Sequence, residues 1–546
     1  MAIVNVLTSA MVGAQDGPSR EGGARESLLV LSDVHLGSDL NVQAMATGFG
    51  RRSKSVDADL AELLRHYRRT PPEGDRWRIV IAGDFIDFIG MALPPDGAEL
   101  ATAPSEEELA HGLGNAADHA GVKLRRVAER HEEVLAALAG FVADGHALTI
   151  VHGNHDVEFH WENVRDEFKA ILRRLAGAPR EGVDGDAFVA RIDFQPWFFY
   201  VGGVAYIEHG HQYDPYCATD LIMAPLSPLD PRRIARGFSD VLLRYVVRPT
   251  KGLREWGHEH LGLVDYIRFG AQLGARGMVT LGVRFASAVI ELFRLRREHF
   301  AEARAALREE HERRVALLAE ATRIGVDRLR ALGALQVPPI TRSIRGILAS
   351  VLLDRLALAL VAAAGLVGVA ISGAQRGHAG WAVALILMTW ALLHRYLTTQ
   401  RQLDPAEQLV DRAAKLAKLF PAAFVVMGHT HIPVEVPVND GSSTYINLGS
   451  WAENEEPEAD GASPHANANA AARTHLVIHP GAAGAVAEFL KWDSTDGPSR
   501  FVSTHLPGLA SPGAASDARA TPSDAVVVAS PLVVEAGATA ADPRAG

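Results

Sequence analysis

Five short groups of Asp, His and Asn residues occur along the chain, and each follows an apolar run. The groups are DVH at residues 33–35, GDFID at 83–87, GNHD at 153–156, HGH at 209–211 and GHTH at 428–431. The runs before them, such as SLLVLS and WRIVIA, are typical of buried strands. Residues just past a strand's carboxyl end lie on the rim of an α/β sheet, where sites are usually built. Together the groups provide the number and kind of ligands that two adjacent divalent metal ions need.

The order and content of these groups resemble the motifs of the calcineurin-like metallophosphoesterases. All five motifs of that family are present, namely D-x-H, GD-x-x-D, GNH[DE], a His that closes a strand, and GH-x-H. A single D-x-H arises often by chance, whereas GNHD and GHTH in this order after strands are specific. The resemblance implies hydrolysis of a phosphoester or phosphoanhydride bond by two metals. It also implies an α/β fold with a sandwich of two sheets flanked by helices.

By resemblance, seven residues of this chain would hold the two metals. Asp84 would bridge them, because a carboxylate can be shared by two cations and offset their repulsion, which a neutral imidazole cannot do. The other expected ligands are Asp33, His35 and His431 for the first metal, and Asn154, His209 and His429 for the second. This set of nitrogen and oxygen ligands without a thiolate suits Mn, Fe or Zn. Such metals would hold the phosphate oxygens and lower the pKa of a bridging water.

Four further residues of the motifs would act on the substrate or support the ligands. In the family the residue that matches His155 lies near the leaving-group oxygen, as proton donor or charge stabiliser. We expect Asp156 to orient the His155 imidazole, and Asp87 to support a metal-ligating histidine. His211 would either contact the substrate phosphate or only cap its loop. A lone His or Asp after a strand is more often a cap or turn residue, but so many candidates in five ordered motifs favour a site.

Composition fits an intracellular enzyme of two or three domains. The chain has 546 residues, of which 48% are hydrophobic, so a large core can form. Its single cysteine, Cys217, excludes an intramolecular disulfide framework and fits a reducing compartment. The formal net charge is −11 and we find no dense basic stripe, which argues against nucleic-acid binding. Residues 1–25 lack a positive n-region and are expected to form a loose leader.

The motif positions predict a catalytic domain that is split by a large insertion. Its first half would span residues 26–214 and its second half 403–503, with an insertion at 215–402 that is too long for a plain connection. In the first half we expect helices at 57–67, 122–143 and 161–175. We expect a surface loop at 453–472, and disorder in residues 504–546, which are rich in Ala, Ser, Pro and Gly.

Two parts of the insertion differ in composition. Residues 284–332 are highly charged with spaced apolar residues, which predicts a long amphipathic helix packed on the catalytic domain or on a sister helix. Residues 356–374 and 379–393 carry no Asp, Glu, Lys or Arg, and a membrane span needs about 20 apolar residues. We therefore expect a transmembrane hairpin over 356–393, the alternative being a buried helical hairpin in a soluble cap.

The charges around the expected hairpin predict its orientation. Several Arg and Lys residues lie before the first segment and after the second, whereas the connecting turn holds only Arg376. The positive-inside rule then places both halves of the catalytic domain in the cytoplasm, at the inner or plasma membrane. Without insertion, the protein would be cytoplasmic.

The sequence indicates the type of reaction more clearly than the substrate. The neighbourhoods SDVHLG, GDFID, GHTHIP and YINLGSW are most similar to the UDP-2,3-diacylglucosamine pyrophosphohydrolases. The chain departs from that subfamily because GNHD stands where GNRD is usual and because the apolar insertion is foreign to it. We expect a phosphorylated substrate that is associated with the membrane. The alternatives are a phosphodiesterase or phosphatase that acts on a soluble substrate with the membrane segment as tether only, and a non-catalytic scaffold of the same fold.

Overall fold

The computed structural model describes most of the predicted catalytic domain and insertion. The described residues are 25–40, 49–95, 99–177, 185–250, 263–373, 379–399, 405–452, 473–481, 484–502 and 526–527. The expected leader (apart from residue 25), the turn around Arg376 and the surface loop at 453–472 lie outside them. Of the predicted disordered tail, only Val526–Val527 is described, and it pairs as strand β13 with β11.

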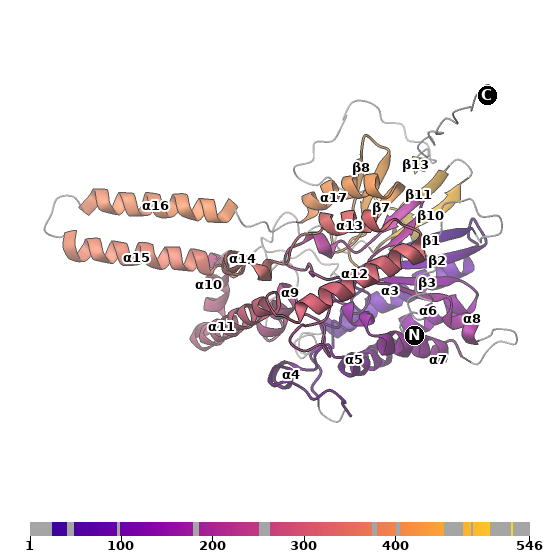
Figure 1. Cartoon of the computed structure of the whole chain (residues 1–546), viewed down its shortest axis with the longest axis horizontal. Coiled ribbons are helices and arrows are strands. Elements are labelled where there is room, and N and C mark those ends of the chain that lie inside the picture. The colour runs from indigo at the N-terminus through magenta and orange to yellow at the C-terminus, as the bar shows by residue number, and fades with distance from the viewer. Residues whose placement is uncertain are drawn as a thin grey trace, which may run out of the picture.

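Two mixed β-sheets lie in the body of the molecule, on the right in Figure 1. The larger sheet comprises β1 (Glu26–Leu31), β2 (Arg76–Ala82), β3 (Ala147–Val151), β4 (Ile192–Gln195), β10 (Thr474–Gly481), β11 (Gly484–Asp493), β12 (Gly497–Arg500) and β13. The smaller sheet comprises β5 (Phe199–Val201), β6 (Gly203–Ile207), β7 (Ala422–Met427), β8 (Val434–Val438) and β9 (Ser443–Asn447). The strand orders are β12-β11-β10-β1-β2-β3-β4 and β5-β6-β7-β9-β8. Strands β1 to β4 are parallel, as are β6, β7 and β9, so their carboxyl ends share one edge of each sheet.

Strand β1 contributes side chains to a hydrophobic core on each of its two faces. Leu29 and Leu31 pack under the helices on the outer face of the larger sheet, whereas Leu28 and Val30 face the smaller sheet. Because both faces of the strand are buried, its sequence is a continuous apolar run instead of an alternating one. This explains why the apolar runs before the motifs could be recognised as strands.

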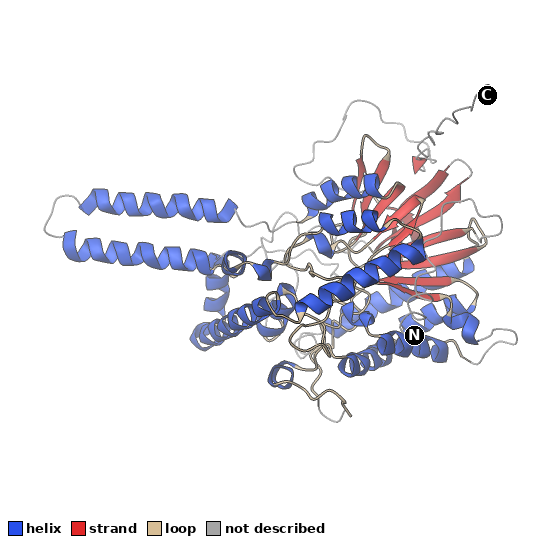
Figure 2. Ribbon diagram, viewed as in Figure 1, coloured by secondary structure: helices blue, strands red, loops and turns tan. Residues whose placement is uncertain are grey.

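Helices cover both outer faces of the sandwich (Figure 2). The larger sheet is covered by α3 (Phe49–Arg69), α5 (Ala117–Arg130), α6 (Glu132–Ala143) and α7 (Glu162–Leu175). The smaller sheet is covered by α12 (Arg304–Thr322), α13 (Val326–Leu335) and α17 (Ala406–Leu419). The shorter helices are α4 (Glu106–His111), α8 (Gly185–Val189), α9 (Phe238–Leu242), η1 (Val157–His160), η2 (His211–Tyr213), η3 (Leu243–Val247) and η5 (Ile340–Arg342).

Two helices expected from the sequence are divided. The helix expected at 122–143 breaks at His131, whose ψ of 33° leaves the helical range while its Nδ1 contacts the Asp57 carboxylate at 2.8 Å. The helix expected at 284–332 forms α11 (Gly274–Glu298), α12 and α13, and α12 ends at Arg323 in the left-handed conformation (φ 57°). Apolar periodicity persists across such breaks, so it does not reveal them.

The apolar segments form a helical hairpin that projects from the body (Figure 1). It follows α10 (Leu263–Gln272), α11 and α14 (Ile344–Ser350), and consists of α15 (Leu353–Gly373) and α16 (Ala379–Thr399) packed against each other. Both helices are long and apolar enough to cross a membrane, which by itself is weak evidence of membrane association. Only 6% of the most apolar window of α15 and none of that of α16 is buried, so the hairpin is not a buried cap.

Candidate metal centre

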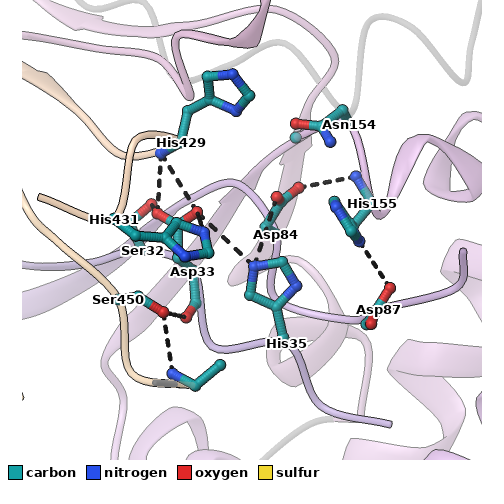
Figure 3. Close-up of polar contacts among 12 residues, drawn as sticks. Ser32, Asp33, His35, Asp84, Asp87, Asn154, His155, His429, His431 and Ser450 are labelled. Carbon is teal, nitrogen blue, oxygen red and sulfur yellow. Dashed lines mark hydrogen bonds and ion pairs between the residues drawn. The ribbon is translucent and has the colours of Figure 1, made fainter. Parts of the chain in front are cut away.

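The five motifs meet where the carboxyl ends of strands from both sheets converge, and Figure 3 shows residues of four of them. The larger sheet supplies Asp33 and His35 after β1, Asp84 and Asp87 after β2, and Asn154, His155 and Asp156 after β3. The smaller sheet supplies His209 and His211 after β6, and His429 and His431 after β7. Residues that lie hundreds of positions apart in the sequence are thus brought to one rim.

The first cluster joins Asp33, His35 and His431, the set expected for the first metal. Their ligand atoms all lie within 4.8 Å of one another, and all three residues are buried. His431 Nε2 lies 3.1 Å from Asp33 Oδ1, and His35 Nε2 lies 3.8 Å from the same oxygen. Two imidazoles and one carboxylate around one point form a donor set that suits a first-row divalent cation.

The second cluster is centred on Asp84 and adjoins the first. Ligand atoms of Asp33, Asp84 and His209 lie within 4.8 Å of one another. His209 Nε2 is 3.1 Å from Asp84 Oδ2 and 3.2 Å from Asn154 Oδ1. His35 Nε2, from the first cluster, is 3.7 Å from the same Asp84 oxygen. Asp84 therefore lies between the two groups, where a bridging carboxylate would have to be.

His429 lies apart from the set in which it was expected. Its backbone N–H donates to both carboxylate oxygens of Asp33, at 3.1 and 3.2 Å, but its ring turns away from Asp84 (Figure 3). Its Nε2 lies 3.0 Å from Asp214 Oδ2, and it groups with Asp214 and Cys217. The rings of His429 and His209 remain 5.3 Å apart between centroids. Its role as a ligand stays a prediction, and Asp214 is a site neighbour that no sequence motif marks.

The loops that carry the clusters hold an unusual backbone. Within these loops, five non-glycine residues adopt positive φ between 51° and 72°, and they are Asp33, His35, Asp84, His429 and His431. Each such conformation costs about 1–3 kcal/mol and persists only where the surroundings enforce it, typically at functional sites. All five are predicted metal ligands, so the strain falls on the residues that would have to converge on one point.

Glycines in two motifs allow the carboxylates to approach the neighbouring loops. A Cβ at Gly153 would collide with the Asp84 carboxylate, and a Cβ at Gly428 would collide with the side chains of Ser32 and Asp33. The glycines of GNHD and GHTH are therefore required by close packing around the two central carboxylates. This gives a physical reason for the motif pattern beyond the ligands themselves.

The loop after β9 supports the backbone of Asp33. Trp451 N–H and Ser450 Oγ both donate to the Asp33 carbonyl oxygen, at 3.0 and 3.2 Å. Asn447 Nδ2 donates to the Gly428 carbonyl at 2.5 Å, which ties this loop to the GHTH loop. The side chains of Asn447 and Ser450 thus bind backbone carbonyls of two motif loops.

The charged groups of the candidate metal centre favour the binding of cations. Burial by itself raises the pKa values of Asp33 and Asp84, yet the neighbouring imidazoles, chiefly His209, hold both well below their usual range. Burial likewise opposes protonation of His155 and His209, but Asp84 and a second carboxylate beside each ring raise both pKa values to about 9. Buried carboxylates that draw positive charge onto their neighbours provide the setting that divalent cations need.

The contacts of His155 differ from those expected. Its Nδ1 is 2.7 Å from Asp87 Oδ1, and its backbone N–H donates to Asp84 Oδ1 at 2.8 Å. Asp156, which was expected to orient this imidazole, instead accepts the N–H groups of Gly153 and Phe85 at 2.6 and 2.8 Å. The correction has a steric reason: Asp156 is used to pin the GNHD loop to the GDFID loop, whereas Asp87 faces the ring directly.

The segment predicted as an insertion contributes a cation to the same arrangement. Arg248, which follows η3, is buried; its Nη2 lies 3.4 Å from Asp87 Oδ2, and its Nη1 donates to the Ile89 carbonyl at 2.5 Å. Asp87 is thus held between Arg248 and His155. No motif marks Arg248, and only its position in space connects it to the site.

His211 lies beside the second cluster without joining it. Its ring centroid is 5.4 Å from that of His209, and its Nε2 accepts a hydrogen bond from the Gln212 side chain at 2.9 Å. Its Nδ1 is buried and has no hydrogen-bond partner among the described residues. Burial and the two neighbouring histidines lower its pKa, so the ring is neutral. Both earlier alternatives, a phosphate contact and a loop cap, remain open.

Comparison with known families agrees with this geometry. Residues 27–261 match the family model described as calcineurin-like phosphoesterase. The match includes the first four motifs and strands β1 to β4 of the larger sheet, while the GHTH loop lies beyond its end. A search of curated proteins finds no match to the chain. The family match and the buried His and Asp clusters together identify a metallophosphoesterase.

Proposed function

We propose that this metallophosphoesterase hydrolyses a phosphoester or phosphoanhydride bond in a substrate carried at a membrane surface. The observation that carries the chemistry is the pair of buried clusters that share the neighbourhood of Asp84. The observation that supports the membrane is the exposed apolar hairpin α15–α16. The catalytic domain would then lie on the cytoplasmic side, as the flanking Arg and Lys residues indicate.

The residues present fit two divalent metal ions. Asp33, His35 and His431 would hold one, Asp84 and His209 with Asn154 would hold the other, and His429 would join them after rotation of its ring. When bound, such metals would supply Lewis-acid contacts to phosphate oxygens and an activated water. Mn, Fe and Zn all suit the nitrogen and oxygen donors.

His155 would act on the leaving group. Its Nδ1 is occupied by Asp87, which leaves Nε2 as the ring nitrogen that can face a substrate. The ring lies 4.7 Å from that of His35, at the edge of the first cluster. From there it can donate a proton to the departing oxygen, while Asp87 and Arg248 hold the ring in place.

The test combines metal content with turnover of a substrate panel by the full-length protein in detergent or nanodiscs. The panel contains nitrophenyl phosphate mono- and diesters, nucleotide sugars, phospholipids and a lipid-linked nucleotide diphosphate of the UDP-diacylglucosamine type. Asp84→Asn keeps the size of the side chain and removes the shared charge, so both metals and turnover should be lost together. Asp411→Asn, on the exposed surface of α17, is the matched control and should retain both.

The panel also separates the substrate classes. A preference for lipid-linked over soluble substrates of the same bond type supports the proposal. Equal turnover of soluble analogues would favour a soluble substrate with the hairpin as a tether only. Near-normal metal content and activity in Asp84→Asn would refute the site assignment.

A further inference from the structure

Helix α11 carries two apolar stripes, of which only one is buried. Leu281, Ala288, Leu292 and Leu295 pack into a core with α9, η3 and α14. Val279, Val283 and Ile290 follow a second helical stripe and are 68%, 60% and 67% exposed. An ordinary surface helix has a polar outer face, so this second stripe needs a partner.

The charge of this region has one sign. From residue 266 to residue 290 the sequence contains no Asp or Glu, and its charged residues are Arg268, Arg276 and Arg284. Arg268 and Arg276 are exposed, whereas Arg284 is bound to Thr250. Exposed apolar side chains next to arginines, without acids, are typical of helices that lie in the headgroup layer of a membrane.

The position of the region matches that composition. The end of α10 and the start of α11 lie at the end of the body from which the hairpin projects (Figure 1). α11 packs on α14, which leads directly into α15. Near the hairpin's base, Ile344 is 46% exposed, and Arg342 and Arg345 are exposed as well. A bilayer that surrounds the hairpin would therefore reach the tip of α10–α11.

We propose that residues 268–283 form an interfacial surface that lies in the headgroup layer beside the inserted hairpin. Met278, Val279 and Val283 would face the acyl boundary, and Arg268 and Arg276 would bind anionic lipid phosphates. The partner is a lipid surface, because the arginines and apolar side chains both match it and because the surface is continuous with the base of the hairpin. This rests on the proposed function, since it assumes that α15–α16 inserts. An interfacial surface at residues 268–283 would fix the tilt of the catalytic domain and the height of the catalytic rim above the bilayer.

The test measures the depth of single fluorescent probes on the full-length protein in lipid nanodiscs. Separate variants Val279→Cys, Val367→Cys and Val502→Cys are labelled with an environment-sensitive dye and quenched by lipids that carry a spin label near the headgroup or deep in the chain. Val502, 77% exposed at the end of the larger sheet, is the control away from the membrane. The unmodified chain, treated in the same way, gives the background from Cys217.

We expect headgroup quenching at residue 279, deep quenching at 367 and none at 502. If 367 is quenched while 279 behaves like 502, the interfacial surface is refuted and the inserted hairpin stands. If 367 is not quenched, the membrane part of the proposed function fails, and the interfacial surface fails with it.

A second measurement tests the arginines. Adding anionic lipid to zwitterionic nanodiscs should increase the quenching at 279. The double substitution Arg268→Gln and Arg276→Gln should abolish that increase, while Arg232→Gln, at an exposed arginine of the body, should not. An unchanged lipid dependence in the double variant would refute phosphate binding by these residues.

Discussion

The contact between Asp87 and His155 gives a sharp test of how the site works. Asp87 Oδ1 lies 2.7 Å from His155 Nδ1 and also accepts the Gly90 N–H at 2.6 Å, while Oδ2 faces Arg248. Both partners are buried, so no water can replace the carboxylate easily. Asp87→Asn keeps the shape but removes the charge, and its amide can present an N–H to the ring in place of an acceptor. His155 would then lose its preferred tautomer and part of its orientation.

The magnitude follows from the strength of the lost interaction. A hydrogen bond to a charged group contributes about 1.5–3 kcal/mol. If the full amount is expressed in the transition state, turnover falls by about 10- to 150-fold, at 1.36 kcal/mol per tenfold. Metal content should not change, because Asp87 is not among the expected ligands. The loss should be larger for an alkyl than for a nitrophenyl leaving group, since the latter needs little protonation.

The assay compares kcat and KM for matched alkyl and nitrophenyl phosphodiesters, together with bound metal. Asp156→Asn is the informative control, because Asp156 holds two backbone N–H groups and does not touch the ring. It should lower thermal stability without a leaving-group preference. Equal losses for both leaving groups in Asp87→Asn, or loss of metal, would refute the assignment of Asp87 as the residue that positions His155.

Two further predictions concern the metal centre, and a third concerns an ion pair of the larger sheet. His155→Ala should retain metal and lose about 10²–10⁴-fold in turnover, as measured by metal analysis and steady-state kinetics. Removal of metal by a chelator should abolish activity, and added Mn should restore it. Burial raises the pKa of Glu26, but Arg78 and Arg76 lower it below its ordinary value, so its contribution is present at neutral pH and is lost as pH falls through the folded pKa. Glu26→Gln should therefore destabilise the fold by about 1.5–3 kcal/mol at pH 7 in denaturant titrations, and by progressively less below pH of about 4.

The place of the site could be predicted from the sequence because it depends on strand ends. Apolar runs buried on both faces mark β1, β2, β3, β6 and β7, and the residues that follow them must meet where parallel strands end. The backbone geometry then follows from the motif glycines, whose positions are part of the pattern. For these reasons the neighbourhood of Asp33, Asp84 and His209 was predictable without a structure.

The details of side-chain pairing could not be predicted in this way. Whether Asp87 or Asp156 faces His155 depends on loop path and rotamer, and both carboxylates lie within four residues of a motif histidine or ligand. The contact of His429 with Asp214 depends on the path of the chain through η2, because Asp214 directly follows this helix. Sequence spacing carries no information on such contacts across loops.

The segment predicted as an insertion connects the metal centre to the hairpin through one packed group of helices. η3 precedes Arg248, which reaches Asp87, and η3 packs on α11 in the same core that includes Ile347 of α14. α14 leads into α15, and Arg355 at the start of α15 donates to the Leu397 carbonyl near the end of α16. The hairpin therefore rests on the helices that hold the arginine behind the His155–Asp87 pair. If the bilayer sets the position of α11 and the hairpin, it also sets the position of the catalytic rim, which is how a membrane-borne phosphate would be brought to the metals.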